Sequence, residues 1–191
     1  DGVPRRAMDI VGRLNAVLFL PRDITLISGS PSERRRYLDI SLCQIVPLYC
    51  RTLARYNRIS SQRNALLRQI REGDSRPDEL VYWNEQLAKL GAFVLWQRLW
   101  AVGQLQPEAD RVQRNLTNDQ ERLGLVYRDS VAARLGPGEG LTVSSIAPEQ
   151  QEAQLEQLQA ALLKALQVTH PEEIARGVTV VGLHRDDLRF M

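Results

Sequence analysis

Two long stretches of the chain carry apolar residues at the spacing of an amphipathic helix. Residues 80–94 place Leu80, Trp83, Leu87, Leu90 and Val94 at alternating steps of three and four, the spacing of a helical seam. The preceding stretch runs from Pro47 to the polar turn at 73–77, and its apolar positions are Tyr49, Leu53, Tyr56, Ile59, Leu66, Leu67 and Ile70. The pattern predicts an antiparallel helical hairpin whose limbs, at roughly 25 residues each, reach about 35–40 Å.

Capping signals mark where the first helix begins. Ser30 suits the N-cap, Pro31 the first helical position and Glu33 the return contact of a capping box,. Because proline has no amide proton, Pro47 is expected to kink or restart this helix. Pro107 is expected to begin a separate helix that runs to Leu116.

Short apolar runs outside the hairpin predict strands at residues 16–20, 123–127 and 178–182,. Residues 136–140 are rich in Gly and Pro and predict a mobile loop,. A Leu- and Gln-rich helix is expected from Pro148 onwards, and a further helical turn from Pro171 to Arg176, ended by Gly177, with His170 in a turn.

The predicted fold is α+β and predominantly helical. It comprises an antiparallel helical hairpin, which forms a coiled-coil-like arm, further helices and a few short strands. Four segments follow along the chain. They are a strand-containing segment (1–30), a helical lobe with the hairpin (31–118), a strand, loop and helix (119–176), and a return strand (177–191).

The second limb has two apolar faces on a helical wheel. Leu80, Leu87, Val94 and Leu105 form the seam, and an aromatic stripe lies nearly opposite, at Tyr82, Phe93, Trp96 and Trp100. Burial of this stripe against the helix at 107–116 or against the rest of the lobe is the favoured interpretation. A protein-binding surface is the alternative, since Trp and Tyr dominate such surfaces.

Two arginines fall on apolar faces, Arg63 on the first limb and Arg98 on the second. An isolated buried charge is very costly, so each side chain either extends along the apolar surface to water or is paired. Structural pairing is favoured for both. By contrast, Arg51, Arg55 and Arg58 share one polar face, as expected for a solvated or phosphate-facing stripe.

The net charge of +2 conceals an uneven distribution. Of 25 basic residues only Lys89 and Lys164 are lysine, and residues 1–76 hold 14 arginines against 7 acidic residues, whereas residues 77–191 hold 11 basic and 16 acidic residues. A GC-rich genome explains the arginine total but not this segregation, which favours a polyanionic or acidic partner. Neither lysine follows a glycine, so the chain has no phosphate-binding P-loop.

The two cysteines, Cys43 and Cys50, lie seven positions apart. On one continuous helix they are separated by about 10 Å, beyond the reach of a disulfide. Two free thiols are typical of a reducing, cytoplasmic compartment. No apolar run approaches the roughly 20 residues that a membrane span requires.

The cluster His184, Arg185, Asp186 and Asp187 is the densest group of reactive side chains. A divalent metal site is possible in principle, but ion pairing between the acids and arginines is favoured. The kinase catalytic-loop pattern fails because the required Asn position is Met191. With only two histidines, no nucleophile has an evident base. We therefore expect no catalytic residues, no metal and no cofactor in this chain alone.

Several stretches together resemble the RecF family of bacterial DNA replication and repair proteins. The matching residues are 17–23, 27–39, which contains Ser30 to Arg36, 55–58, 62–67, 83–87 with 90–91, and 177–188, which contains the His184 to Asp187 cluster. They follow the family's order along almost the whole chain. One departure is Leu183, where the family usually has proline before the His-Arg-Asp-Asp run.

The resemblance implies a role for the chain as the central part of an SMC-like ATPase. Segments 1–30 and 177–191 would belong to the ATPase lobe, whereas the P-loop, signature and Walker B motifs would lie outside this chain. The family is associated with ATP- and Mg²⁺-dependent dimerisation on DNA gaps, and with RecO and RecR in loading RecA.

The resemblance also suggests which residues contact DNA. Arginines on helices would meet phosphates without reading bases; we expect Arg51, Arg55 and Arg58 first, and Arg34, Arg35 and Arg36 second. For the second group, the alternative is that at least one arginine packs against the acidic second half. The alternative function is a protein-interaction arm that docks a RecR-like partner or a second subunit through the aromatic stripe.

Overall fold

The computed structural model describes residues 20–136 and 141–191. Its principal helices are α2 (Pro31–Ile45), α3 (Pro47–Glu72), α4 (Leu80–Leu116) and α6 (Gln151–Arg176). The shorter elements are α1 (Thr25–Ser28), α5 (Ser130–Leu135) and 3-10 turns at Pro21–Ile24, Pro77–Glu79, Val143–Ser145 and Pro148–Gln150. Strands β1 (Leu125–Arg128) and β2 (Asp187–Phe190) complete the described fold.

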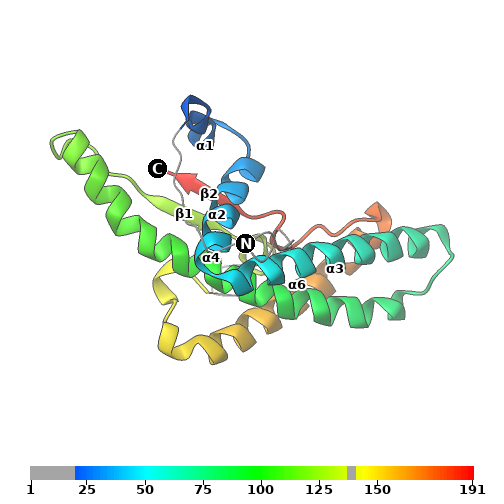
Figure 1. Ribbon diagram of the computed structural model, residues 1–191. Coiled ribbons are helices and arrows are strands. Elements are labelled where there is room, and N and C mark those ends of the chain that lie inside the picture. Colours follow the sequence, from blue (N-terminus) through cyan, green and yellow to red (C-terminus); the bar gives the residue numbers. More distant parts are fainter. Residues whose placement is uncertain (1–19, 137–140) are drawn as a thin grey trace, which may run out of the picture.

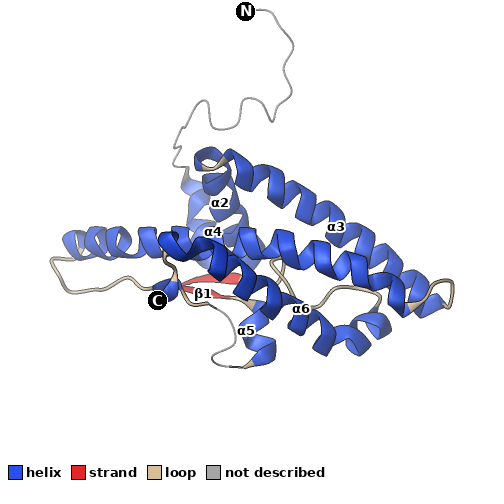
Figure 2. Cartoon of the chain, turned by 90° about the horizontal axis from the view of Figure 1, so that it is seen from below, coloured by secondary structure: helices blue, strands red, loops and turns tan. Residues whose placement is uncertain are grey.

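Helices α3 and α4 form the predicted antiparallel hairpin, and α6 packs along α4 (Figure 1). The tip of the hairpin lies at one end of the molecule, and the last turns of α4 project at the opposite end. Seen from below, α6 runs beside the α3–α4 pair, and α5 lies near β1 (Figure 2). The predominantly helical α+β prediction, with a hairpin and few strands, is confirmed.

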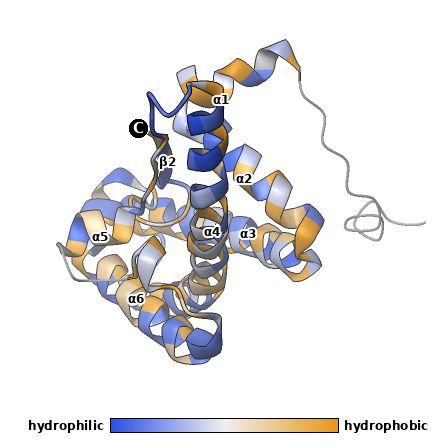
Figure 3. Ribbon diagram, turned by 90° about the vertical axis from the view of Figure 1, so that its left-hand side faces the viewer, coloured by the Kyte–Doolittle hydropathy of each residue, from blue (hydrophilic) through white to orange (hydrophobic). Residues whose placement is uncertain are grey.

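The core lies where α3, α4 and α6 meet. Leu67, Val94 and Ala165 are fully buried there, and the helices alternate hydrophobic and hydrophilic positions as amphipathic packing requires (Figure 3),. Gly91 lets the helices approach closely, since an added Cβ would lie 3.1 Å from Leu162 and 3.3 Å from Tyr56. No helix in the described segments is long and apolar enough to cross a lipid bilayer.

The predicted signals at the ends of α2 and α3 are confirmed. Pro31 is the first residue of α2, and the Glu33 carboxylate accepts a 2.7 Å hydrogen bond from the Ser30 amide. Pro47 ends α2 and starts α3, and Gly73 terminates α3 in the left-handed region at φ +88°. The predicted strand at 16–20 and most of the predicted loop at 136–140 lie outside the described residues.

Two predicted helix breaks are wrong, because α4 continues through Pro107 and α6 continues through Pro171. Contacts beyond each proline hold the helix in place. Beyond Pro107, Asp110 accepts from the Leu123 amide at 3.2 Å, and beyond Pro171 the buried Glu173 pairs with Arg63. His170 therefore lies within α6 rather than in a turn.

The strand predicted at 178–182 is also wrong. Its amides are bound by side chains instead of a neighbouring strand: Thr179 N donates to Asn64 Oδ1 at 2.8 Å, and Gly182 N to Ser130 Oγ at 2.8 Å. Buried amides must find partners, and here those partners are side chains. The strand lies further on, at β2, which pairs antiparallel with β1 so that Leu125 faces Phe190.

Candidate nucleic-acid interface

Helix α3 presents a cationic face. It carries six arginines against one acidic residue, Glu72. Arg51, Arg55 and Arg58 are exposed, as their shared polar face predicts. Arg55 donates a long 3.4 Å hydrogen bond to Gln86 Oε1, and within residues 20–136 and 141–191 no carboxylate lies at ion-pair distance from any of the three. Their charges therefore remain directed to solvent.

Arg34 and Arg35, on the first turns of α2, are bound within the protein instead. Arg34 donates to both carboxylate oxygens of Asp187 at 2.8 and 3.1 Å. Arg35 donates to the Asp186 carbonyl at 2.5 Å. The alternative that this group packs against the acidic second half is correct for these two residues, and neither presents a free guanidinium for phosphates in this structure. Arg36 alone of the three is exposed.

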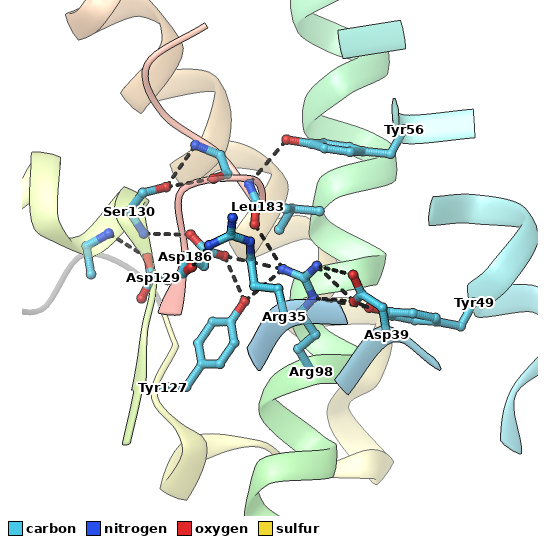
Figure 4. A network of polar contacts seen from close by, with 12 residues as sticks. Arg35, Asp39, Tyr49, Tyr56, Arg98, Tyr127, Asp129, Ser130, Leu183 and Asp186 are labelled. Carbon is cyan, nitrogen blue, oxygen red and sulfur yellow. Dashed lines mark hydrogen bonds and ion pairs between the residues drawn. The ribbon is translucent and has the colours of Figure 1, made fainter. Parts of the chain in front are cut away.

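A buried arginine, Arg98, lies at the centre of a polar network that joins several elements of the fold (Figure 4). It binds Asp39 bidentately, Nε to Oδ1 at 3.0 Å and Nη2 to Oδ2 at 3.0 Å. Its Nη1 donates to the Leu183 carbonyl at 3.0 Å and to the Tyr127 hydroxyl at 3.1 Å. The predicted pairing of Arg98 is confirmed, and this one side chain of α4 fixes α2, β1 and the segment before β2.

Asp186 completes the same network. Its carboxylate accepts from the Tyr127 hydroxyl and the Ser130 amide, each at 2.8 Å. Burial raises the pKa of Asp186, whereas Arg98 and the hydrogen bonds from Ser130 and Tyr127 oppose that rise. Asp186 is 1% exposed, so it is closed to solvent and to any substrate.

The other members of the terminal cluster are also structural. Burial alone would raise the pKa of Asp187, but the hydrogen bonds and positive charges of Arg34 and Arg189 together outweigh it, and the pKa lies below its ordinary value. Because His184 Nε2 lies 3.1 Å from the Thr179 carbonyl, which can only accept, that nitrogen carries the proton. Arg185 donates to the same carbonyl at 3.3 Å. The described residues contain no group of three or more His, Cys, Asp or Glu side chains that could hold a metal ion.

Arg63, the other arginine that falls on an apolar helix face, is fully buried and paired. Its Nη2 binds Glu173 Oε2 at 2.6 Å, and both side chains have no exposed surface. Its Nε donates to Asn84 Oδ1 and its Nη1 to Thr179 Oγ1, each at 2.8 Å. All three arms of the guanidinium thus have acceptors, and the predicted structural pairing is confirmed.

Comparisons with known proteins identify relatives that match almost the whole chain. A DNA replication and repair protein RecF from Roseiflexus castenholzii is 44% identical over 188 residues, covering 96% of this chain and 44% of the relative. The protein of the same description from Heliobacterium modesticaldum is 40% identical over 186 residues, covering 97% and 45%. No family model matches the chain.

Solved structures share the fold. One, described as the recombination mediator protein RecF-ATPrS in the RecFOR pathway, superposes with a TM-score of 0.84 at 26% identity and covers 98% of this chain and 46% of its own. A second, described as RecF-ATP in the same pathway, gives 0.76 at 30% identity, with 96% and 44% covered. The chain belongs to the RecF family. It spans about half the length of the curated relatives it matches.

In this RecF-family chain the aromatic stripe is largely internal. Trp96 is 4% exposed and donates to Gln154 Oε1 of α6 at 2.9 Å, and Phe93 and Trp100 are partly buried against the core. Burial against the lobe is therefore correct for these three residues, and α6 contacts Trp96. Trp96 is not available to a partner in this structure, whereas Tyr82 is 57% exposed.

Sequence reasoning missed the acceptors that organise the RecF-family chain. Asp39, Tyr127 and Ser130 surround Arg98 and Asp186, and Glu173 neutralises Arg63. A local signal existed for Glu173 alone, since its spacing places it on the same face of α6 as Leu162 and Leu166,. An acidic residue on an apolar face predicts a buried cationic partner.

Proposed function

We propose that this chain is the DNA-facing part of a RecF-type DNA replication and repair protein, and that Arg51, Arg55 and Arg58 contact backbone phosphates. The observation that carries this proposal is the exposed cationic face of α3, which lacks acidic partners among the described residues. Guanidiniums bind phosphate oxygens through paired donors. Such contacts position DNA without reading sequence.

The proposed contact surface is rigid. Helix α3 is held along its inner side by buried Tyr49, Tyr56 and Leu67 and by the Arg63–Glu173 pair. Because the helix is held in this way, the backbone that carries the three exposed arginines is already fixed. Less conformational entropy is therefore lost when the arginines bind phosphates. Arg36 of α2 is the natural fourth contact, because Arg34 and Arg35 are bound internally.

The finer parts of the proposal follow from family membership. The full-length protein would bind DNA gaps as an ATP-dependent dimer and act with RecO and RecR to load RecA. ATP and Mg²⁺ would be bound by regions beyond this chain, which has no P-loop lysine,. This chain alone would then bind DNA without hydrolysing ATP. A protein-interaction arm remains the second candidate, with exposed Tyr82 as its contact.

A salt titration tests the phosphate contacts. The 191-residue chain is titrated onto a fluorescently labelled gapped duplex at several salt concentrations, with a variant in which Arg51, Arg55 and Arg58 are all changed to Ala. Each phosphate contact contributes about 0.9 to the slope of log affinity against log salt. The triple variant should therefore bind more weakly and lower the slope magnitude by about 2–3.

The matched control changes Arg111, Arg114 and Arg122 to Ala. This variant removes the same charge, but Arg111 and Arg114 lie in the last turns of α4, Arg122 lies in the segment that follows it, and each is already paired with an acidic residue. Its affinity should fall much less. Equal losses for the two triple variants, or no binding by the unmodified chain at low salt, would refute the proposal.

A further inference from the structure

Cys43 and Cys50 lie on opposite sides of the junction between α2 and α3. On a continuous helix the two thiols would be far apart, but α2 ends at Ile45 and α3 starts at Pro47. Val46 between them is extended, at φ −124° and ψ 92°. This break turns the chain, so that the Cys43 thiol is hydrogen-bonded to the Cys50 thiol. Neither cysteine forms a disulfide in this structure.

Small molecules can reach the pair. Cys43 and Cys50 both line a cavity of about 580 Å³ between α2 and α3, and each residue is partly exposed. Ile40 and Leu53 also line the cavity, together with polar side chains that include Arg36 and Asn57. A hydroperoxide is small and uncharged, so it can enter such a cavity.

We propose that Cys43 and Cys50 form a redox-sensitive pair, which a hydroperoxide oxidises to an intramolecular disulfide across the α2–α3 junction. In the first step the Cys50 sulfur attacks the peroxide oxygen, giving a sulfenic acid and releasing an alcohol, or water from hydrogen peroxide. In the second, the Cys43 sulfur attacks the Cys50 sulfur, and the sulfenic oxygen leaves as water with the Cys43 proton. The peroxide is reduced, and the two thiols are oxidised by two electrons.

The order of the steps follows from the environment of Cys43. Burial and the hydrogen bond with Cys50 raise the pKa of the Cys43 thiol to about 12. The thiolate is the nucleophile in such reactions, so Cys43 is a poor first attacker and Cys50 takes that role. The contact between the two sulfurs then places Cys43 to resolve the sulfenic acid before further oxidation.

The disulfide would alter the junction directly. It would close the short loop 43–50 and fix the angle between α2 and α3, which carry Arg36 and Arg51 respectively. Closing a loop by a disulfide restricts the unfolded chain. Oxidised protein should therefore melt at a higher temperature than reduced protein, independently of whether the chain binds DNA.

Mass spectrometry of the peroxide-treated 191-residue chain tests the proposal. After the remaining thiols are alkylated and the protein is digested with trypsin, both cysteines fall in one peptide, 37–51, because Arg36 and Arg51 flank it and no Lys or Arg lies between. The expected product is this peptide about 2 Da lighter through the loss of two hydrogen atoms, with no alkylation. A reductant should restore both the mass and the melting temperature.

Single variants test the assigned roles. Cys43→Ser should accumulate a sulfenic acid on Cys50 that a dimedone probe traps, whereas Cys50→Ser should react at least about tenfold more slowly. Neither variant should gain melting temperature on oxidation. The proposal is overturned if the wild-type peptide instead gains oxygen, if disulfide-linked dimers form, or if both variants react at the same rate.

Discussion

Changing Arg63 to Met should be among the most destabilising single substitutions in this chain. Arg63 and Glu173 are both fully buried, at 2.6 Å. Removing the guanidinium leaves the carboxylate buried without its countercharge, which costs about 3–5 kcal/mol. The lost bond to Asn84 adds little, because Asn84 is half-buried and water can replace the donor. The uncompensated charge on Glu173 therefore dominates the magnitude.

A double-mutant cycle separates charge from packing. Glu173→Gln removes the charge while its amide oxygen can still accept from the Val180 amide, which donates to Glu173 Oε1 at 2.9 Å. In the Arg63→Met background this second change should restore stability, because the buried side chain is then neutral. We expect a coupling free energy of about 1–3 kcal/mol between the two sites.

Urea denaturation of the four proteins at neutral pH supplies the free energies of unfolding. The urea concentration at the midpoint of unfolding should be lower for Arg63→Met than for the wild type. The m-value should stay the same, since the same surface is exposed on unfolding. Arg58→Met is the matched control on the same helix, where the side chain is exposed, and it should change stability by less than about 0.5 kcal/mol. A cost below about 1 kcal/mol for Arg63→Met, or additive single changes, would refute the buried-pair interpretation.

Two further predictions concern pH and backbone conformation. Because Arg34 lowers the pKa of Asp187 in the folded state, the carboxylate stabilises the fold above its unfolded pKa of about 4 and loses this effect as pH falls through the folded value. The stability difference between wild type and Asp187→Asn should thus be constant from neutral to mildly acidic pH and shrink below about pH 4; a difference that grows in acid would contradict the pairing. Gly182→Ala should cost about 3 kcal/mol or more, since φ is +126° and an added Cβ would lie 2.6 Å from the Tyr56 hydroxyl,. Gly73→Ala, at φ +88° with no atom within 4 Å, should cost only about 1–2 kcal/mol, and thermal melts that rank the two equally would refute the steric argument.

The hairpin could be predicted because local signals and periodicity agree there. The N-terminal cap at Ser30, the break at Pro47 and the left-handed glycine at Gly73 all act within a few residues. Helical wheels also placed Arg63 and Arg98 on apolar faces, where pairing was favoured, and the structure shows both buried. The helical periodicity shows that an arginine lies on an apolar face. It does not show which acidic or polar residue accepts the hydrogen bonds of that arginine.

Residues 178–186 could not be predicted from their own sequence. The valines and the flanking glycines favour a strand, yet the amides of this segment bind Asn64, Glu173, Ser130 and the Tyr56 hydroxyl. Three of these four acceptors are more than 50 positions away in the sequence. Long-range side-chain hydrogen bonds thus replace a strand ladder where the local pattern cannot show it.

At Pro107 and Pro171 the error is of another kind. The local rule that a proline ends a helix predicts a break, but the helix continues. A proline inside a helix removes one backbone hydrogen bond and costs about 3 kcal/mol. At Pro171 the helix continues because stopping would withdraw Glu173 from Arg63, at a comparable or larger cost. The buried pair and the uninterrupted α6 are therefore one structural feature.

The arrangement of ion pairs explains why a nearly neutral chain can still present a strongly basic surface. Arg34, Arg63 and Arg98 are paired with Asp187, Glu173 and Asp39 in buried or half-buried positions. These acidic residues lower the net charge of the chain, but their fields are largely cancelled inside it. Arg51, Arg55 and Arg58, which are exposed on α3, have no acidic residue at ion-pair distance among the described residues. The field that a polyanion meets is therefore set by which charges are paired and not by their sum, and it should weaken with salt as exposed charges do.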